Sequence, residues 1–183
     1  MRRSAVAAIL VALSLSAAPQ VHRHDPLTSA ETDALREVSM EPEKKLPLYV
    51  KYAQARLASI EQLRTDPQAT PERGRKIHDL LEDFKIIVDE MDRNLDSFAT
   101  QKLDFRKALK QMIQVDGEFQ TTIQKLKESA KDPANAAEAK DSEFAVLDAA
   151  DAVDGNLENA KDLLAEQEKA AAEAKAKAKE KKR

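Results

Sequence analysis

Large apolar side chains recur at alternating intervals of four and three residues through the middle of the chain, and no other feature constrains the fold as strongly. An α-helix has 3.6 residues per turn, so this spacing gathers the side chains along one side of a helix. Such a stripe packs well against other helices at a shallow angle. The series consists of Ile77, Leu81, Phe84, Val88, Met91, Leu95, Phe98, Phe105, Leu109, Met112, Phe119, Ile123 and Leu126, and the spacing continues through two polar positions, Lys102 and Asp116.

Shorter apolar stripes with helical spacing lie on either side of this series, from Tyr49 to Leu63 and from Val146 to Leu164. The chain has only 3 glycines in 183 residues, and 34% of its residues are charged. Its long stretches of Ala, Glu, Lys, Leu, Gln and Arg favour helix over sheet, because these side chains lose little freedom in a helix. We therefore predict an all-α fold, an up-and-down four-helix bundle of long antiparallel helices with a short N-terminal helix and a charged helical C-terminal extension.

Local signals mark where the first helices begin. Thr28 and Glu31 form a capping box, which predicts the start of a short helix. Pro42 suits the first turn of a second helix over residues 42–65. Pro47 marks either the true start of that helix or a kink within it, because an interior proline removes a backbone donor.

Two further pairs of residues predict later helix starts. Thr70 followed by Pro71 places an N-cap before a first-turn proline, and the same logic applies to Asp132 and Pro133. Residues 71–130 then form either one helix of about 90 Å or two helices in phase. We favour a break near Ala99, because a single helix of that length would extend beyond its neighbours and leave apolar side chains without a partner.

The N-terminus has the order of a secretory signal peptide, with two arginines, an apolar run too short to span a membrane, and then small residues. We predict a signal peptide over residues 1–18, cleaved between Ala17 and Val21, and a flexible leader over residues 19–27. The protein is then exported, and is periplasmic or secreted. With no cysteine in the chain, the exported fold has no disulfide and rests on packing alone.

We assign residues 28–165 to the bundle and residues 166–183 to an Ala-, Lys- and Glu-rich basic tail. The last ten residues contain six basic side chains and one acidic side chain, whereas the whole chain has a formal net charge of −3. A basic tail suits a protein or anionic envelope partner, such as lipid head groups or acidic cell-wall polymer. The favoured interpretation of the tail taken alone is a solubilising segment that can also fold back on the acidic body.

The tail has no aromatic residue to stack on bases and no apolar face to enter a bilayer. We therefore predict no nucleic-acid partner and no transmembrane span in the mature chain. The sequence is compatible with a homo-oligomer.

Residues 148–159, DAADAVDGNLEN, raise the question of a calcium loop, because acidic residues at short intervals precede Asp-Gly. An EF-hand loop needs oxygens at positions 1, 3 and 5 and a glutamate at position 12, which this stretch does not supply. Asp151, Asp154 and Glu158 instead fall on the helix face turned away from the predicted core. They are weak candidates for cation binding, and a solvated helix face is the favoured interpretation.

Asp116 is the fourth weak candidate, because it falls on the apolar stripe between Met112 and Phe119. A carboxylate in a helix seam is costly unless it is paired, hydrogen-bonded or reached by water. One hypothesis is a functional buried acid, acting as a ligand or a register device. The favoured alternative is that Gly117 loosens the helix, so that Asp116 lies near a kink and meets a lysine or water.

Nothing in the sequence indicates catalysis, and we predict a protein that is not an enzyme and has no metal or cofactor. The chain has no G-x-S-x-G elbow and no Gly-rich phosphate loop. His22 and His24 lie in the leader, and His78 has no glutamate three residues before it. The metal-binding Glu-x-x-His pattern of di-iron bundles is therefore missing.

The segment Leu27-Thr28-x-x-Glu31 resembles a short motif of small exported helical chaperones of bacterial envelopes, which has Gln at the last position. The resemblance covers five residues and coincides with the capping box. We expect an exported, noncatalytic helical bundle that acts by protein or envelope contact, as an adaptor, structural or chaperone-like protein. The alternative is a small-molecule or cation-binding bundle that uses Asp116 or the acids of residues 148–162.

Overall fold

The computed structural model describes residues 25–66 and 72–181, and over these residues the protein is an all-helical bundle without a strand. The predicted signal peptide and most of the predicted leader lie outside the described residues. The elements are α1 (Ser29–Glu37), α2 (Pro42–Thr65), α3 (Arg73–Thr100), α4 (Arg106–Ser129), a 3₁₀ turn η1 (Pro133–Asn135) and α5 (Ala136–Glu180).

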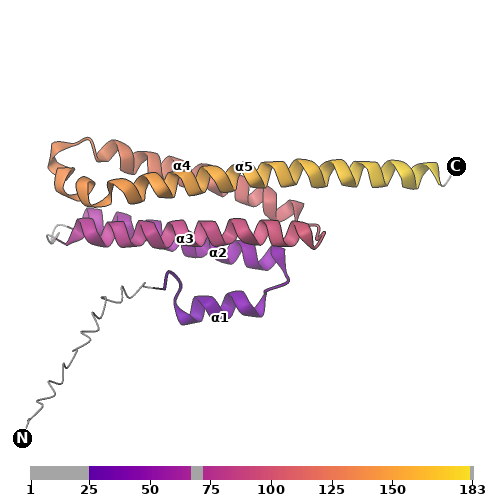
Figure 1. Cartoon of the computed structure of the whole chain (residues 1–183), viewed down its shortest axis with the longest axis horizontal. Helices are drawn as coiled ribbons and strands as arrows, with labels where there is room; N and C mark the ends of the chain where they lie inside the picture. Colours follow the sequence, from indigo (N-terminus) through magenta and orange to yellow (C-terminus); the bar gives the residue numbers. More distant parts are fainter. Residues whose placement is uncertain (1–24, 67–71, 182–183) are drawn as a thin grey trace, which may run out of the picture.

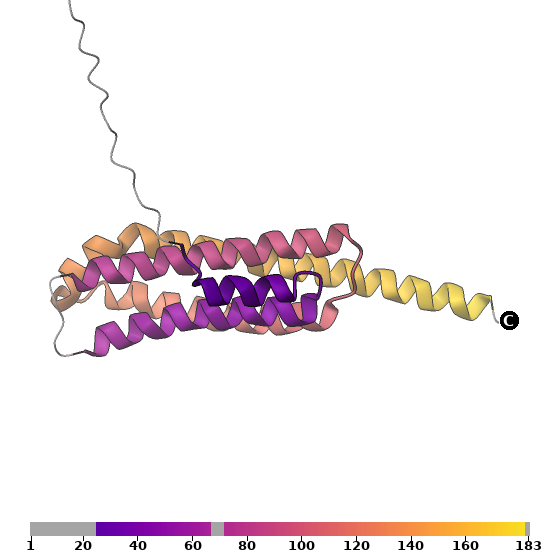
Figure 2. The same cartoon turned by 90° about the horizontal axis from the view of Figure 1, so that it is seen from below.

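The four long helices lie side by side, and α1 lies against the outer side of α2 (Figures 1 and 2). Helix α3 packs against both α2 and α5, and α4 packs against the same two helices. Helix α5 is longer than its neighbours and runs beyond them toward the C-terminus (Figure 1). Within the described part of the chain, no helix has an apolar stretch long enough to cross a membrane.

The heptad stripe predicted from the sequence forms the core. Phe84 of α3 is fully buried, and its ring meets Phe119 of α4 edge to face with the ring centroids 5.2 Å apart. Such pairs contribute about 0.5–1.5 kcal/mol beyond the burial of their area. Truncating a core phenylalanine to alanine costs about 3–5 kcal/mol, so the stripe supplies much of the stability.

The predicted break between two helices is confirmed, and it occurs between Thr100 and Arg106. Lys102 takes a left-handed conformation with φ of 57°. The Leu103 N–H donates to the Phe98 carbonyl over 3.1 Å, which closes the helix end in the manner of a Schellman motif. The position suits glycine, but a lysine occupies it at some strain. This is why no glycine or proline marks the break in the sequence.

The capping box at the first helix is confirmed, because Thr28 and Glu31 exchange hydrogen bonds. Glu31 also accepts two hydrogen bonds from Arg56 of α2, over 2.8 and 2.6 Å. These contacts with Arg56 lower the pKa of Glu31 to about 2, against the opposing effect of burial. Arg56 further donates to the Pro26 carbonyl over 2.6 Å, so one side chain holds both α1 and the segment before it against α2.

The predicted helix over residues 42–65 is confirmed as α2, with Pro47 inside it rather than at its start. Helix α3 begins at Arg73, two residues later than predicted. The predicted cap at Thr70 and Pro71 lies outside the described residues. The Asp132 side chain accepts from the Ala134 N–H and caps η1, so that α5 begins only at Ala136.

Candidate functional site

The three candidate acids of the 148–159 stretch lie on the outside of α5. Asp151, Asp154 and Glu158 are all exposed, as their helical spacing predicts. Asp154 accepts a hydrogen bond from the Gln120 side chain of α4 over 2.6 Å. No group of three or more His, Asp or Glu side chains in the described ranges is close enough to share a metal ion. The structure therefore does not bring these acids together with Asp116.

Asp116 lies in the centre of the bundle with no exposed surface. The structure shows no break in α4 at Gly117, because the helix continues through this residue to Ser129. The sequence favoured a lysine or a water molecule as the partner of Asp116. Instead the Asn156 side-chain amide of α5 donates to Asp116 Oδ2 over 2.9 Å. Asn156 is itself 1% exposed, so the two side chains form a buried polar pair between α4 and α5.

One oxygen of each side chain has no hydrogen-bond partner among the described residues. These atoms are Asp116 Oδ1 and Asn156 Oδ1, both buried. Two acceptors cannot bond to each other while the carboxyl is ionised. A protonated Asp116 has an O–H donor, and the amide oxygen of Asn156 is an acceptor of the kind that such a donor needs. The chemistry of the pair therefore favours the neutral acid.

The surroundings of Asp116 favour the same protonation state. Burial raises the pKa of Asp116 to about 7, against the opposing effect of the hydrogen bond from Asn156. The charge of Asp92 on α3 also raises this pKa, and the charge of Lys161 on α5 lowers it. The carboxyl group of Asp116 consequently changes its charge near neutral pH, far above the usual range for aspartate.

Sequence reasoning missed Asn156, although a signal for it was present. Asn156 lies three residues after Val153 and four before Ala160, which is the spacing of the apolar stripe. The prediction for this stretch considered only the acids and overlooked the amide among them. Two polar residues at seam positions of neighbouring helices would have indicated a buried pair.

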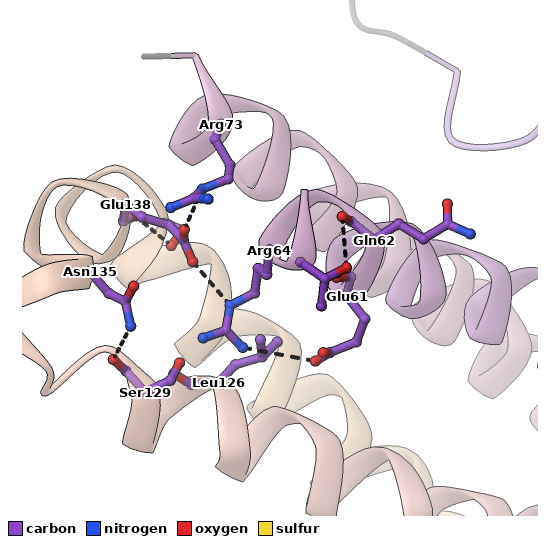
Figure 3. Close-up of polar contacts among 10 residues, drawn as sticks. Glu61, Gln62, Arg64, Arg73, Leu126, Ser129, Asn135 and Glu138 are labelled. Atoms are coloured by element: carbon purple, nitrogen blue, oxygen red, sulfur yellow. Dashed lines mark hydrogen bonds and ion pairs between the residues drawn. The ribbon is translucent and has the colours of Figure 1, made fainter. Parts of the chain in front are cut away.

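A second polar cluster closes the end of the bundle where α4 leads into α5. Figure 3 shows Glu138 of α5 between two arginines, Arg64 of α2 and Arg73 of α3. The N–O distances are 3.2 Å to Arg64 and 2.8 Å to Arg73. The three side chains are 13%, 18% and 24% exposed respectively, so water screens them only in part. Glu138 thus joins three helices at this end of the bundle.

The helices approach closely at the same end. A Cβ atom at Gly74 of α3 would lie 2.9 Å from the Cβ atom of Asp141 on α5, closer than such atoms approach in proteins. Glycine is therefore needed there for the contact between α3 and α5. At the adjoining turn, the Asn135 side chain donates to the Ser129 carbonyl over 3.0 Å (Figure 3).

A cleft of about 440 Å³ lies beside this cluster, between the end of α4 and the start of α5. This volume is within the range of about 300–1,000 Å³ that is typical of small-molecule sites. Its apolar lining includes Ile77, Leu126 and Val146, one from each of α3, α4 and α5. Lysines from both α4 and α5 also line it. Sequence reasoning missed the cleft, because its walls come from three separate helices.

At the other end of the bundle, α5 leaves its neighbours. Gln167 donates to the Leu103 carbonyl over 3.1 Å and accepts from the Phe105 N–H over 3.2 Å, so it holds the connection between α3 and α4. Glu168 pairs with Lys110 over 2.8 Å. From Ala172 to Glu180 every residue is exposed. We call residues 172–181 the basic extension.

These features define an all-helical bundle with a buried polar pair, a lysine-lined cleft at one end and a projecting basic helix at the other. Comparisons of the chain with protein-family models, with curated proteins and with solved structures gave no match.

Proposed function

We propose that this protein is an exported, noncatalytic helical bundle that acts by contact, as an adaptor, structural or chaperone-like protein of the envelope. The projection of α5 beyond the bundle is the observation that carries this proposal (Figure 1). Residues 172–180 make up about two and a half turns of helix with every residue exposed. A surface of this kind is available to a partner.

The chemistry of the basic extension favours an anionic partner. Lys175, Lys177, Lys179 and Lys181 are exposed, and alanines separate the first three from one another. Residues two apart lie on opposite sides of a helix, so the positive charge lies on two opposite sides of the extension. Without an apolar face, the extension attracts by charge and does not insert into a bilayer.

The continuity of α5 argues against a tail that folds back on the body. Folding back would require a turn, and α5 is unbroken from Ala136 to Glu180. The contacts of Gln167 further hold α5 to the bundle where the extension begins. The positive charge is therefore directed away from the acids of the bundle.

We also infer that the four long helices form an up-and-down bundle that serves as a rigid base for the extension. Support comes from the packing pairs α2 with α3, α3 with α5, α5 with α4 and α4 with α2, which make a closed ring. The short connections between α3 and α4 and between α4 and α5 suit antiparallel neighbours. A rigid base holds the basic extension in one direction.

Cell fractionation of a truncated chain tests the proposal. The contacts of Gln167 and Glu168 favour a truncation that begins at Ala172, because a cut at residue 166 would also remove the support of the α3–α4 connection. We expect the full chain to be exported and to fractionate with the envelope at low salt. The chain lacking residues 172–183 should be exported equally but found in the soluble fraction.

Charge variants separate the role of the lysines from that of helix length. Changing Lys175, Lys177, Lys179 and Lys181 to glutamine should release the protein from the envelope, whereas changing them to arginine should not. Addition of salt should release the unchanged chain, because exposed charges are screened. Unchanged envelope association of the truncated chain, or retention of the full chain in the cytoplasm, would refute the proposal.

A further inference from the structure

We propose that the cleft between the end of α4 and the start of α5 binds an anionic amphiphile of the single-chain fatty-acid class, with its carboxylate at the lysines and its chain on the apolar floor. The proposal is independent of the function proposed above. Residues from the end of α4 and the start of α5 line the cleft, and these helix ends lie at the opposite end of the bundle from the basic extension (Figure 1).

The floor of the cleft suits an alkyl chain. Ile77, Leu126 and Val146 are 2%, 6% and 9% exposed, so their side chains are held by the core, and all three line the cleft. Ala130 and Ala139 leave space there because their side chains are short. A concave apolar surface on rigid helices binds apolar chains by removing both surfaces from water.

The charges around the cleft suit an anionic head group. Lys127 lines it from α4, Lys131 from the connection between α4 and η1, and Lys140 from α5. None of the three takes part in an ion pair with another described residue. Two glutamates, Glu138 and Glu143, are also part of the lining. The carboxylate of Glu138 pairs with Arg64 and Arg73, which offset its charge (Figure 3). The exposed Glu143 is then opposed by three lysines. Charge complementarity therefore selects an anion over a cation.

Apolar side chains continue outward from the cleft along α5. Leu147 lines the cleft and is 46% exposed, and Phe144, three residues earlier on the same side of α5, is 75% exposed. Residues three apart are neighbours on a helix surface. Within the described residues, large apolar side chains with this much exposure are few. They offer contact to the part of a chain that extends beyond the cleft.

Isothermal titration calorimetry of the full chain with laurate, below the concentration at which laurate forms micelles, tests the proposal. We expect one-to-one binding. Changing Lys127, Lys131 and Lys140 together to glutamine should weaken it roughly tenfold, through the loss of three partly exposed attractions. A matched variant with Lys51, Lys107 and Lys169 changed to glutamine should bind within about twofold of the unchanged chain, because these lysines lie outside the cleft.

A further variant and a second probe test the two halves of the site separately. Ala139→Leu should weaken laurate binding by filling the floor without any change of charge. Dodecyltrimethylammonium, which has the same chain length and a positive head, should bind roughly tenfold more weakly than laurate. Circular dichroism melting of each variant verifies that it folds. Absence of laurate binding, equal loss in the two lysine variants, or equal affinity for the two probes would overturn the proposal.

Discussion

Two groups of acidic residues in this protein lie in contrasting environments. Asp116 is fully buried between α4 and α5, with one hydrogen bond from Asn156. Asp151, Asp154 and Glu158 lie on the outer face of α5, only a few residues from Asn156 in sequence. Carboxylates in water retain their hydration, whereas a buried carboxylate loses hydration that one amide only partly replaces. A carboxyl group is therefore expected to change the free energy of unfolding very little on the outer face of α5. In the buried position of Asp116 it is expected to lower that free energy.

Removing Asn156, the partner of the buried carboxyl, should have the largest effect on the free energy of unfolding. At pH 8 we expect Asn156→Leu to lower the free energy of unfolding by about 3–5 kcal/mol, because Asp116 is then left buried without its hydrogen bond. Urea unfolding measures this change.

Asn159→Leu is the matched control on the same helix. Asn159 donates to Asp92 and Asp96 over 2.8 and 3.0 Å, but it is partly exposed. Water can replace those bonds, so we expect a loss of about 1 kcal/mol or less. Equal losses in the two variants would contradict the contrast between the buried and exposed faces.

The pH dependence of stability should show an effect of similar size on the free energy of unfolding. The pKa of Asp116 is raised from 3.8 to about 7, so the folded chain retains a proton that the unfolded chain has released. Stability should therefore fall as the pH rises from about 4 to about 7, by about 4 kcal/mol in total for this group. Below this range both states are protonated and the penalty disappears.

Asp116→Asn should remove this pH dependence, because an amide has no proton to lose and can pair with Asn156 in both directions. Urea unfolding of both chains between pH 5 and pH 8 measures the difference. Glu31 does not interfere, because its lowered pKa affects stability only as the pH falls below about 4.5. If the free energy of unfolding changed with pH in the same way in the two chains, Asp116 would not be protonated in the folded state at neutral pH.

Glu138 provides a carboxylate of intermediate exposure and should show an intermediate effect. Glu138→Gln weakens the contacts with Arg64 and Arg73, and we expect a loss of about 1–2 kcal/mol in the free energy of unfolding. Glu143→Gln is the control, because Glu143 is exposed one and a half turns later on α5. A loss for Glu143→Gln as large as that for Glu138→Gln would refute the structural role of the cluster.

The smallest effect is expected on the outer face of α5. Changing Asp151, Asp154 and Glu158 together to their amides should alter stability by no more than about 0.5 kcal/mol. Calcium or zinc at millimolar concentration should not raise the melting temperature of the unchanged chain. A rise that disappears in the triple variant would instead support the cation-binding alternative, since a bound ion stabilises the folded state.

Much of the helical architecture could be predicted from the sequence, because helix formation and amphipathic spacing are local properties. The predicted helix over residues 42–65, the capping box of Thr28 and Glu31, and the break near Ala99 are confirmed. The exact form of the break was not predictable from turn residues, because Lys102 occupies a position that favours glycine. The signal peptide, the export route and the partner remain predictions.

The polar sites were less accessible to sequence reasoning. Asp116 falls on the apolar stripe of its helix, and the structure buries it there. Its partner could not be identified from α4 alone, because Asn156 lies 40 residues later on another helix. Pairing between two helices depends on their relative rotation and axial register, and the sequence of one helix does not encode either.

By itself, the sequence determined which segments become helices, which face of each helix is apolar and where positive charge accumulates. These properties follow from the period of the α-helix and from the residues along each segment. Tertiary structure alone decided that Asp116 meets Asn156, that Glu138 lies between two arginines, and that three helices enclose a cleft. The physical reason is that such contacts arise from how side chains of separate helices interlock, and many weak packing interactions between all the helices set that fit together.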